Sequence, residues 1–224
     1  MEQGDAFAMN KPTSRSGALL IVCAPSGAGK STLISRLKQE FPRILFSVSC
    51  TTRAPRDGEI DGVHYHFWDK ETFLIRKKMG YFAESACVHG NWYGTPLAPL
   101  KEMLNEGRDV LFDIDVQGAA QLKQTMPNGR YAFIFPPSMA ILEQRLRDRG
   151  TDSEEAICRR LANAANEIRE ADWFDAWIIN DTLDWAYTQL RSFYIAATMD
   201  PALRADFKQS LLMENYNGKT DSSS

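Results

Sequence analysis

The sequence contains no long hydrophobic run. None of its apolar stretches approaches the ~18 residues that a membrane-spanning helix needs. The first residues include Glu2 and Asp5 and lack the apolar segment of a signal peptide. These absences predict a soluble, cytoplasmic protein that has no membrane partner.

The chain also lacks an excess of positive charge. Its 26 Lys and Arg residues are outnumbered by 29 Asp and Glu residues, which gives a formal net charge of −3. A protein that binds polymeric nucleic acid usually presents a basic face. We therefore expect no nucleic-acid partner.

Cysteines and histidines, the residues that form disulfides and bind metals, are few and poorly spaced for either purpose. The four cysteines are scattered and form no C-x-x-C pair, which favours free thiols over a disulfide framework or a zinc site. His64 and His66 form an H-x-H, but no cysteine or second histidine pair lies near them in the sequence. We expect no metal there.

At 224 residues the chain is long enough for one α/β domain with inserted subdomains. The apolar run at 18–23 predicts a buried parallel strand, and Leu33, Leu37 and Phe41 recur at the spacing of a helix. Between them lies Ala24–Ser31, which reads APSGAGKS. A strand, a glycine-rich loop, a lysine, a hydroxyl and a helix in this order are typical of a phosphate-binding loop.

Each part of this loop has a physical use. Gly27 and Gly29 let the backbone curl so that its N–H groups point at an anion. Lys30 can reach the outer phosphates, and the Ser31 hydroxyl can ligate Mg²⁺. The loop begins with Ala24, where glycine is usual. The alternative is a plain turn between strand and helix, and the flanking segments disfavour it.

Residues 46–99 interrupt the alternation of strand and helix. Short β-branched and aromatic runs at 46–49 and 63–68 alternate with turn residues, and a short helix is predicted near 71–78. This pattern predicts a small mixed subdomain inserted between core strands.

The parallel pattern then resumes. Core strands are predicted at 110–115, 131–135 and 177–179, with helices at 117–125, 138–149, after 153 and within 182–213. The fold expected is an α/β protein with a P-loop parallel sheet flanked by helices, an inserted subdomain and a helical lid. The expected divisions are an N-terminal extension (1–16), core (17–47, 100–137 and 171–214), the inserted subdomain (48–99), a lid region (138–170) and a flexible tail (215–224).

The lid region is rich in charge of both signs. Arg145 and Arg149 would share one face of a helix, and Arg160 follows on the next helix. Such arginines can close over a transferring phosphoryl group and exclude water. They fit equally well a solvated helix with i,i+4 ion pairs to neighbours such as Glu143. The residues alone leave both interpretations open.

A GTPase is a further alternative, because Asp115–Gly118 matches D-x-x-G after a strand. A GTPase also needs N-K-x-D to recognise guanine. The nearest string, at 218–221, lacks the asparagine. This argues against a GTPase.

The inserted subdomain offers groups for a phosphate acceptor. Arg53 and Arg56 flank Pro55 on a predicted turn, and their guanidinium forks suit one phosphate monoester. Tyr65 and Tyr93 could add phenolic donors to the same oxygens.

Five motifs occur in a fixed order between about residues 17 and 200: APSGAGKS, SVSCTTRAPRDGE, GNWYGT, DIDVQG and RLRDRGT. Together they resemble the guanylate kinase family. The resemblance implies transfer of a phosphoryl group from ATP to GMP, with Mg²⁺ as the cofactor. It also implies that the inserted subdomain binds GMP, and that ATP and GMP are the partners of a monomer or homo-oligomer.

The resemblance also implies residue roles. The ATP-binding residues would be Ser26, Gly27, Ala28, Gly29, Lys30, Ser31, Thr32 and Asn180, with Ser31 also at the metal. The GMP-binding residues would be Ser49, Arg53, Arg56, Tyr65, Glu84, Tyr93, Thr95, Asp113 and Asp115. The catalytic residues would be Lys30, Arg53, Arg145, Arg149 and Arg160.

Guanine recognition by Glu84 has a physical basis. Guanine presents N1–H and its 2-amino group as adjacent donors, which one carboxylate can accept together. Adenine would leave that carboxylate unpaired, at a cost of about 1–3 kcal/mol or more. Without the resemblance, Glu84 would be interpreted as an ordinary surface carboxylate.

Two rival functions follow from the same motifs. A related phosphotransferase with another acceptor would keep the phosphate-binding loop and lid but lack the guanine-binding residues. A protein-binding scaffold of the same fold would typically lack an intact loop. The presence of Lys30 and the lid arginines favours an enzyme.

Overall fold

The computed structural model describes residues 15–217, apart from positions 89, 149 and 151. Most of the expected N-terminal extension, most of the expected tail and Arg149 therefore lie outside the described residues. Ser16, the last residue of that expected extension, contacts the folded part of the chain, because its N–H donates to the Leu203 carbonyl at 2.9 Å. At the other end, helix α8 (Phe207–Asn217) extends into the expected tail.

The core is one parallel sheet of five strands in the order β2-β7-β1-β8-β9. This confirms the expected parallel sheet. Its strands are β1 (Leu19–Cys23), β2 (Leu45–Phe46), β7 (Val110–Asp113), β8 (Arg130–Phe135) and β9 (Ala176–Ile179). The phosphate-binding loop follows β1, the middle strand, so it lies at the carboxyl edge of the sheet, where α/β proteins bind ligands.

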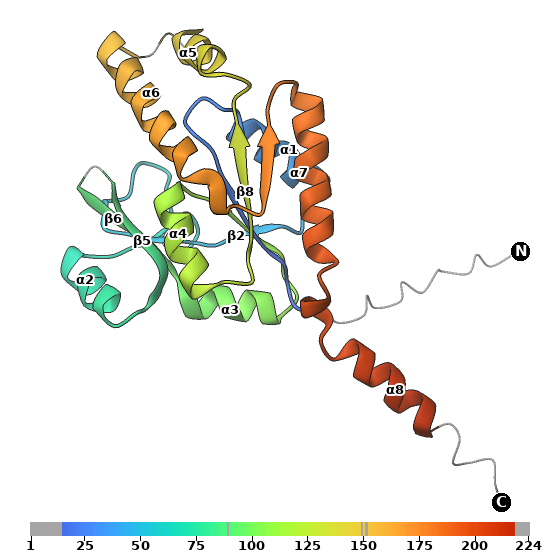
Figure 1. The fold of residues 1–224 in the computed structure, drawn as a ribbon. Coiled ribbons are helices and arrows are strands. Elements are labelled where there is room, and N and C mark those ends of the chain that lie inside the picture. Colours follow the sequence, from blue (N-terminus) through green and yellow to red (C-terminus); the bar gives the residue numbers. More distant parts are fainter. Residues whose placement is uncertain (1–14, 89, 149, 151, 218–224) are drawn as a thin grey trace, which may run out of the picture.

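Helices cover both faces of this sheet (Figure 1). They are α1 (Lys30–Glu40) and α7 (Leu183–Thr198) on one face, and α3 (Leu97–Asn105) and α4 (Val116–Thr125) on the other. Side chains of β1 alternate between the two cores, with Leu20 and Val22 on the first side and Ile21 on the second. Burial on both faces explains why this strand is a continuous apolar run.

The inserted subdomain has its own sheet, in the order β4-β3-β6-β5. Its elements are β3 (Cys50–Thr51), β4 (His66–Phe67), α2 (Lys70–Lys78), β5 (Phe82–Val88) and β6 (Asn91–Pro96). The β-branched and aromatic run at 46–49 forms no strand of this sheet, because Phe46 pairs with Leu111 in the core sheet and the next three residues form no strand. The β5–β6 hairpin and α3 were not predicted.

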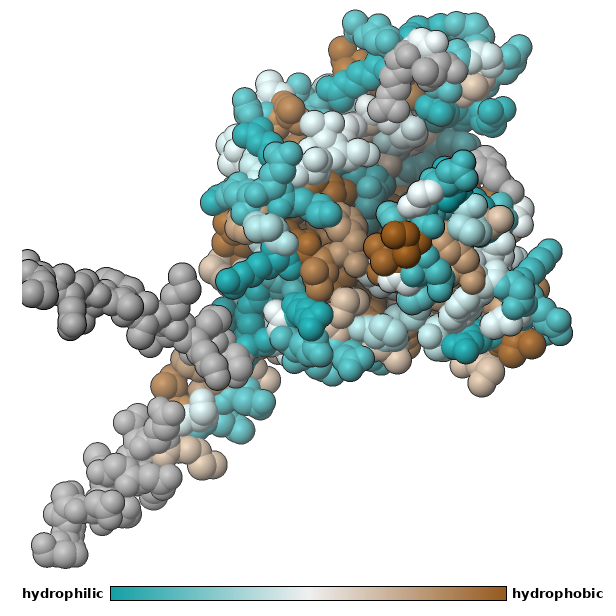
Figure 2. Space-filling view, turned by 180° about the vertical axis from the view of Figure 1, so that it is seen from behind, coloured by the Kyte–Doolittle hydropathy of each residue, from teal (hydrophilic) through white to brown (hydrophobic). Residues whose placement is uncertain are grey.

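The lid region contains two helices, α5 (Met139–Asp148) and α6 (Glu154–Arg169). Each starts directly after a serine, within one residue of the start that the sequence predicts. Ser138 Oγ accepts a hydrogen bond from the N–H of Ile141, and Ser153 Oγ accepts one from Ala156. Figure 2, a view from behind, shows the lid region as a mainly hydrophilic lobe at the top with a recess beneath it.

Three further helices lie in the part of the chain that the structure describes. They are η1 (Ala171–Trp173), η2 (Pro201–Arg204) and α8, which extends away from the sheet in Figure 1. Within residues 15–217, no helix combines the length and the hydrophobicity that crossing a bilayer requires.

Candidate active site

The phosphate-binding loop is held in shape by its glycines and by Asn180. Gly27 and Gly29 have φ of 98° and 94°, a region that side-chain-bearing residues rarely adopt. Asn180, which follows β9, is buried, and its Nδ2 donates to the Ala28 carbonyl at 2.7 Å. A Cβ on Gly29 would lie 2.3 Å from this Nδ2, so the close approach requires glycine. The loop is therefore preformed.

Lys30 begins α1 and points across to the end of β7. Its Nζ lies 2.6 Å from Asp113 Oδ1 and donates to the Ile114 carbonyl at 3.2 Å. The Asp113 side chain is 36% exposed, so this ion pair can rearrange when a ligand binds. Ser31 and Thr32 are exposed at the amino end of α1, where partial positive charge favours an anion.

Arg145 of α5 connects the lid region to this loop. Its Nη2 donates to the Asn180 carbonyl at 3.0 Å. Its Nη1 is buried and has no hydrogen-bond partner among the described residues. Because an unpaired buried donor of a charged group is costly, this atom is suited to a ligand anion.

Glu84 lies on β5 and is only 8% exposed. Thr95 Oγ1, on the neighbouring β6, donates to Glu84 Oε1 at 2.8 Å, and the hydroxyls of Thr95 and Ser49 are 3.2 Å apart. Burial raises the pKa of Glu84, the Thr95 hydrogen bond lowers it, and the charge of Asp115 raises it further, so the net shift is upward. The structure thus brings the three predicted base-binding residues together.

Arg53 is held by an ion pair within the inserted subdomain. It makes a bidentate pair with Glu59, with Nη2 to Oε1 at 2.8 Å and Nη1 to Oε2 at 3.0 Å. The hydrogen bonds from Arg53 and from the backbone N–H of Arg56 lower the pKa of Glu59 to about 2. Tyr65 and Tyr93 stand beside this pair, with ring centroids 6.0 Å apart. Arg56 itself is exposed.

Two other arginines of the lid region, Arg147 and Arg160, form ion pairs. Arg160 Nη1 lies 3.0 Å from Asp152 Oδ2, and Arg147 pairs with both Glu143 and Glu154. Arg147 thus forms an i,i+4 pair with Glu143, whereas Arg145 contacts Asn180, the residue that supports the phosphate-binding loop. Arg149 lies outside the described residues.

Asp115 has a structural task that the sequence did not indicate. It caps α4, and its Oδ1 accepts from the N–H of Gly118 at 2.8 Å. A groove lies between α4 and α6 beside it, lined in part by Gln117 and Glu167. Burial raises the pKa of Glu167, Lys30 lowers it and Asp115 raises it, with a net upward shift.

Sequence reasoning therefore missed Glu59 and Glu167. Glu59 ends the R-A-P-R-D-G-E string, and an acidic residue six positions after Arg53 was the available signal. Glu167 carried no such signal, since its place depends on how α6 packs.

A glycine-rich anion loop at the carboxyl edge of a parallel sheet, with a lysine, a lid region and an acceptor subdomain, defines a phosphotransferase of the P-loop class. A sequence profile described as guanylate kinase matches residues 16–197. The chain belongs to the guanylate kinase family.

Individual relatives agree with this assignment. The chain is 61% identical over 198 residues to a guanylate kinase of Nitratidesulfovibrio vulgaris, covering 88% of this chain and 96% of that one. It is 54% identical over 197 residues to a guanylate kinase of Lawsonia intracellularis, covering 88% and 93%. The crystal structure of guanylate kinase from Anaplasma phagocytophilum superposes with a TM-score of 0.62 at 32% identity, covering 84% of this chain and 90% of that one.

Proposed function

We propose that this chain catalyses ATP + GMP → ADP + GDP with the residues gathered at the carboxyl edge of the sheet. The observation that carries the proposal is the buried carboxylate of Glu84, which has one side-chain donor, Thr95, and an upward-shifted pKa. A buried acceptor with unused capacity is matched by a ligand that offers two adjacent donors. The N1–H and 2-amino groups of guanine do so.

The base-binding set is completed by hydroxyls. Thr95 and Ser49 form a hydrogen-bonded pair next to Glu84, and either hydroxyl can rotate to donate to guanine O6. Adenine would leave Glu84 buried and unpaired, at a cost of about 1–3 kcal/mol or more. The set therefore favours GMP over AMP.

The GMP phosphate would bind at Arg53, Arg56, Tyr65 and Tyr93. Arg53 already presents its planar fork to the carboxylate of Glu59, which occupies the position suited to a phosphate. Binding of GMP would exchange one anion for another at this guanidinium. Arg53 is consequently oriented before the substrate arrives.

The ATP phosphates would bind along Ser26–Thr32, where the loop N–H groups and the amino end of α1 face the same space. Asn180 supports this loop through Ala28. Magnesium fits the residues present, because Ser31 offers one exposed hydroxyl and Mg²⁺ usually takes few protein ligands together with phosphates and waters. When bound, it supplies charge neutralisation at the β- and γ-phosphates.

Phosphoryl transfer here needs no general base. The attacking oxygen of GMP is already ionised, so catalysis consists of alignment and neutralisation of charge. Lys30 would leave Asp113 for the phosphates, and Arg145, Arg149 and Arg160 would face the transferring group. Asp113 and Asp115 would border the acceptor nucleotide. Closing the lid region would exclude water and prevent hydrolysis of ATP.

The chain would divide into the core (17–47, 100–137 and 171–214), the inserted GMP-binding subdomain (48–99) and the lid region (138–170). Its substrates would be free nucleotides, not polymeric nucleic acid, and it would act in the cytoplasm as a monomer or homo-oligomer.

A coupled assay of ADP release tests the function. ADP should appear with ATP, Mg²⁺ and GMP together, and only slowly when AMP replaces GMP. Strong activity on AMP or a sugar phosphate, with none on GMP, would replace this proposal by a related phosphotransferase. Binding of nucleotides with no turnover on any acceptor would favour a binding scaffold.

A further inference from the structure

Strand β5 carries Glu84 on the edge of its sheet, next to β6 only. The register between the two strands shifts at this point, since Phe82 pairs with Pro96 but Glu84 pairs with Thr95. Ala83 is therefore an extra residue, a β-bulge placed directly before Glu84. Bulges change the direction of a side chain, and this one aims the residue that the proposed function assigns to guanine.

Helix α4 approaches the bulge from the core domain. Thr125 Oγ1 donates to the Ala83 carbonyl at 2.8 Å, and Gln121 Oε1 accepts from the Ser85 N–H at 3.1 Å. Both bonds reach backbone atoms, one on each side of Glu84. Gln121 and Thr125 are one helical turn apart, so they lie on the same face of α4.

The burial of these residues shows what the contacts do. Ala83 and Ser85 are 2% and 7% exposed, whereas Gln121 and Thr125 are exposed residues outside the hydrophobic core. The two side chains therefore add little apolar packing. Instead, their hydrogen bonds satisfy backbone groups on the outer edge of β5, where no further strand pairs.

A third point of α4 lies beside Glu84 itself. A Cβ on Gly118 would stand 3.6 Å from Glu84 Oε2, so the helix passes next to the carboxylate. Asp115, one turn earlier, caps the helix, and its carbonyl lies 3.6 Å from the Sγ of Cys23, the last residue of β1 before the phosphate-binding loop. Helix α4 thus links β5 to the end of β1, the strand that leads into the phosphate-binding loop.

We propose that Gln121 and Thr125 are positioning residues that hold the bulge in β5 and so fix the direction in which Glu84 meets the guanine base. The inference rests on the proposed function of Glu84. Neither residue touches the substrate, and their effect passes through the β5 backbone. Because pairing with the 2-amino group depends on the aim of Glu84, they act on base discrimination more than on phosphoryl transfer.

The test compares GMP with IMP, which lacks the 2-amino group, in Gln121→Met, Thr125→Val and the double variant. The ratio of kcat/KM for GMP to that for IMP should fall about fivefold in each single variant, the factor produced by losing one neutral hydrogen bond. It should fall further in the double variant. The KM for ATP should stay unchanged. Thr125→Ser keeps the hydroxyl and should restore the ratio.

Thr198→Val is the matched control, because it also removes a hydroxyl bond to a carbonyl, that of Ile195 in α7, away from β5. A purely structural loss would lower kcat for both acceptors and leave the ratio unchanged. Amide hydrogen exchange at Ser85 gives a readout independent of activity and should accelerate in Gln121→Met.

The outcomes separate two failures. If the wild-type enzyme phosphorylates GMP but the variants keep its GMP-to-IMP ratio, only the positioning role is overturned. Unchanged amide exchange at Ser85 in Gln121→Met would overturn it too. Equal loss of the ratio in Thr198→Val overturns it as well. If the wild-type protein does not phosphorylate GMP, the proposed function is wrong, and this inference fails with it.

Discussion

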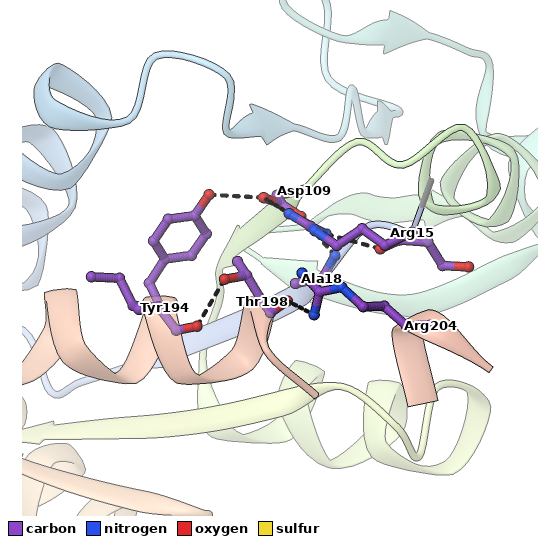
Figure 3. A network of polar contacts seen from close by, with 8 residues as sticks. Arg15, Ala18, Asp109, Tyr194, Thr198 and Arg204 are labelled. Carbon is purple, nitrogen blue, oxygen red and sulfur yellow. Dashed lines mark hydrogen bonds and ion pairs between the residues drawn. The ribbon is translucent and has the colours of Figure 1, made fainter. Parts of the chain in front are cut away.

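Two buried carboxylates, Asp109 and Glu84, are 7% and 8% exposed, yet their environments differ. Asp109 precedes β7 and accepts two hydrogen bonds from Arg15, one from the Ala18 N–H and one from the Tyr194 hydroxyl, all within 2.7–2.8 Å (Figure 3). Glu84 accepts one from a side chain, that of Thr95.

The pKa directions follow from this difference. Burial raises the pKa of Asp109, but the hydrogen bonds from Arg15, Ala18 and Tyr194 outweigh it and leave the pKa lowered. For Glu84, burial prevails and the pKa is raised. Asp109, at the end of the core sheet remote from the phosphate-binding loop, is saturated with internal partners, while Glu84, on the subdomain sheet, keeps capacity for a ligand. The same burial thus serves stability in one place and binding in the other.

The largest effect expected at the ligand-binding end comes from Lys30→Met. Removing this cation should lower kcat by about 10²–10³-fold, the loss typical of one preorganised donor to developing charge. The urea midpoint should change little, because the partner Asp113 is 36% exposed and can be solvated. Near-normal turnover at saturating ATP would remove Lys30 from the mechanism.

Asp109→Asn should have the opposite profile. Breaking a buried ion pair leaves Arg15 without its counter-ion, and the free energy of unfolding should fall by about 3 kcal/mol. The kcat of the remaining folded protein should be unchanged. Urea unfolding measures the loss, and Asp184→Asn is the matched control, since the Asp184 side chain in its pair with Arg36 is 90% exposed. Equal losses in both variants would contradict the comparison.

Glu84→Gln should weaken the binding of GMP by about tenfold, the effect of losing a hydrogen bond to a charged group. It should also make the ligand-free protein more stable at neutral pH, because it removes a buried charge with few partners. Calorimetry with GMP and urea unfolding measure the two changes, with the exposed Glu102→Gln as control. A destabilised variant with unchanged GMP affinity would show that Glu84 is structural.

The smallest effects are the pH dependences of stability. Asp109 has a lowered folded pKa, so its contribution is present above its ordinary pKa and disappears as pH falls through the folded value. Glu84 has a raised folded pKa, so stability falls as pH rises from its ordinary value through the raised one. Relative to Asp109→Asn, wild type should lose stability in acid. Relative to Glu84→Gln, wild type should lose stability as pH rises. Parallel curves would contradict both directions.

The parts of the site that are local in sequence could be predicted. The apolar run of β1, the glycine-rich loop and the start of α1 are contiguous, so Lys30 and Ser31 could be placed from their neighbours alone. The serine caps of α5 and α6 were equally readable, because a cap depends on the next three residues.

Contacts between distant segments could not be predicted in this way. Arg15 and Asp109 are 94 positions apart, and Asp109 and Tyr194 are 85 apart. Arg15 lies within the segment expected to be a loose extension, yet it completes the Asp109 site. The bulge at Ala83 also prevented a prediction of β5 from the sequence. It breaks the regular alternation of buried and exposed residues by which a strand is recognised.

The pair between Arg53 and Glu59 has a consequence for selectivity. A carboxylate tethered six residues away competes with every incoming anion at a high effective concentration. Free inorganic phosphate, which brings no other contacts, must displace Glu59 with its charge alone. A mononucleotide bound as proposed would have a second point of attachment, its base, and could displace Glu59 from Arg53 where free phosphate could not.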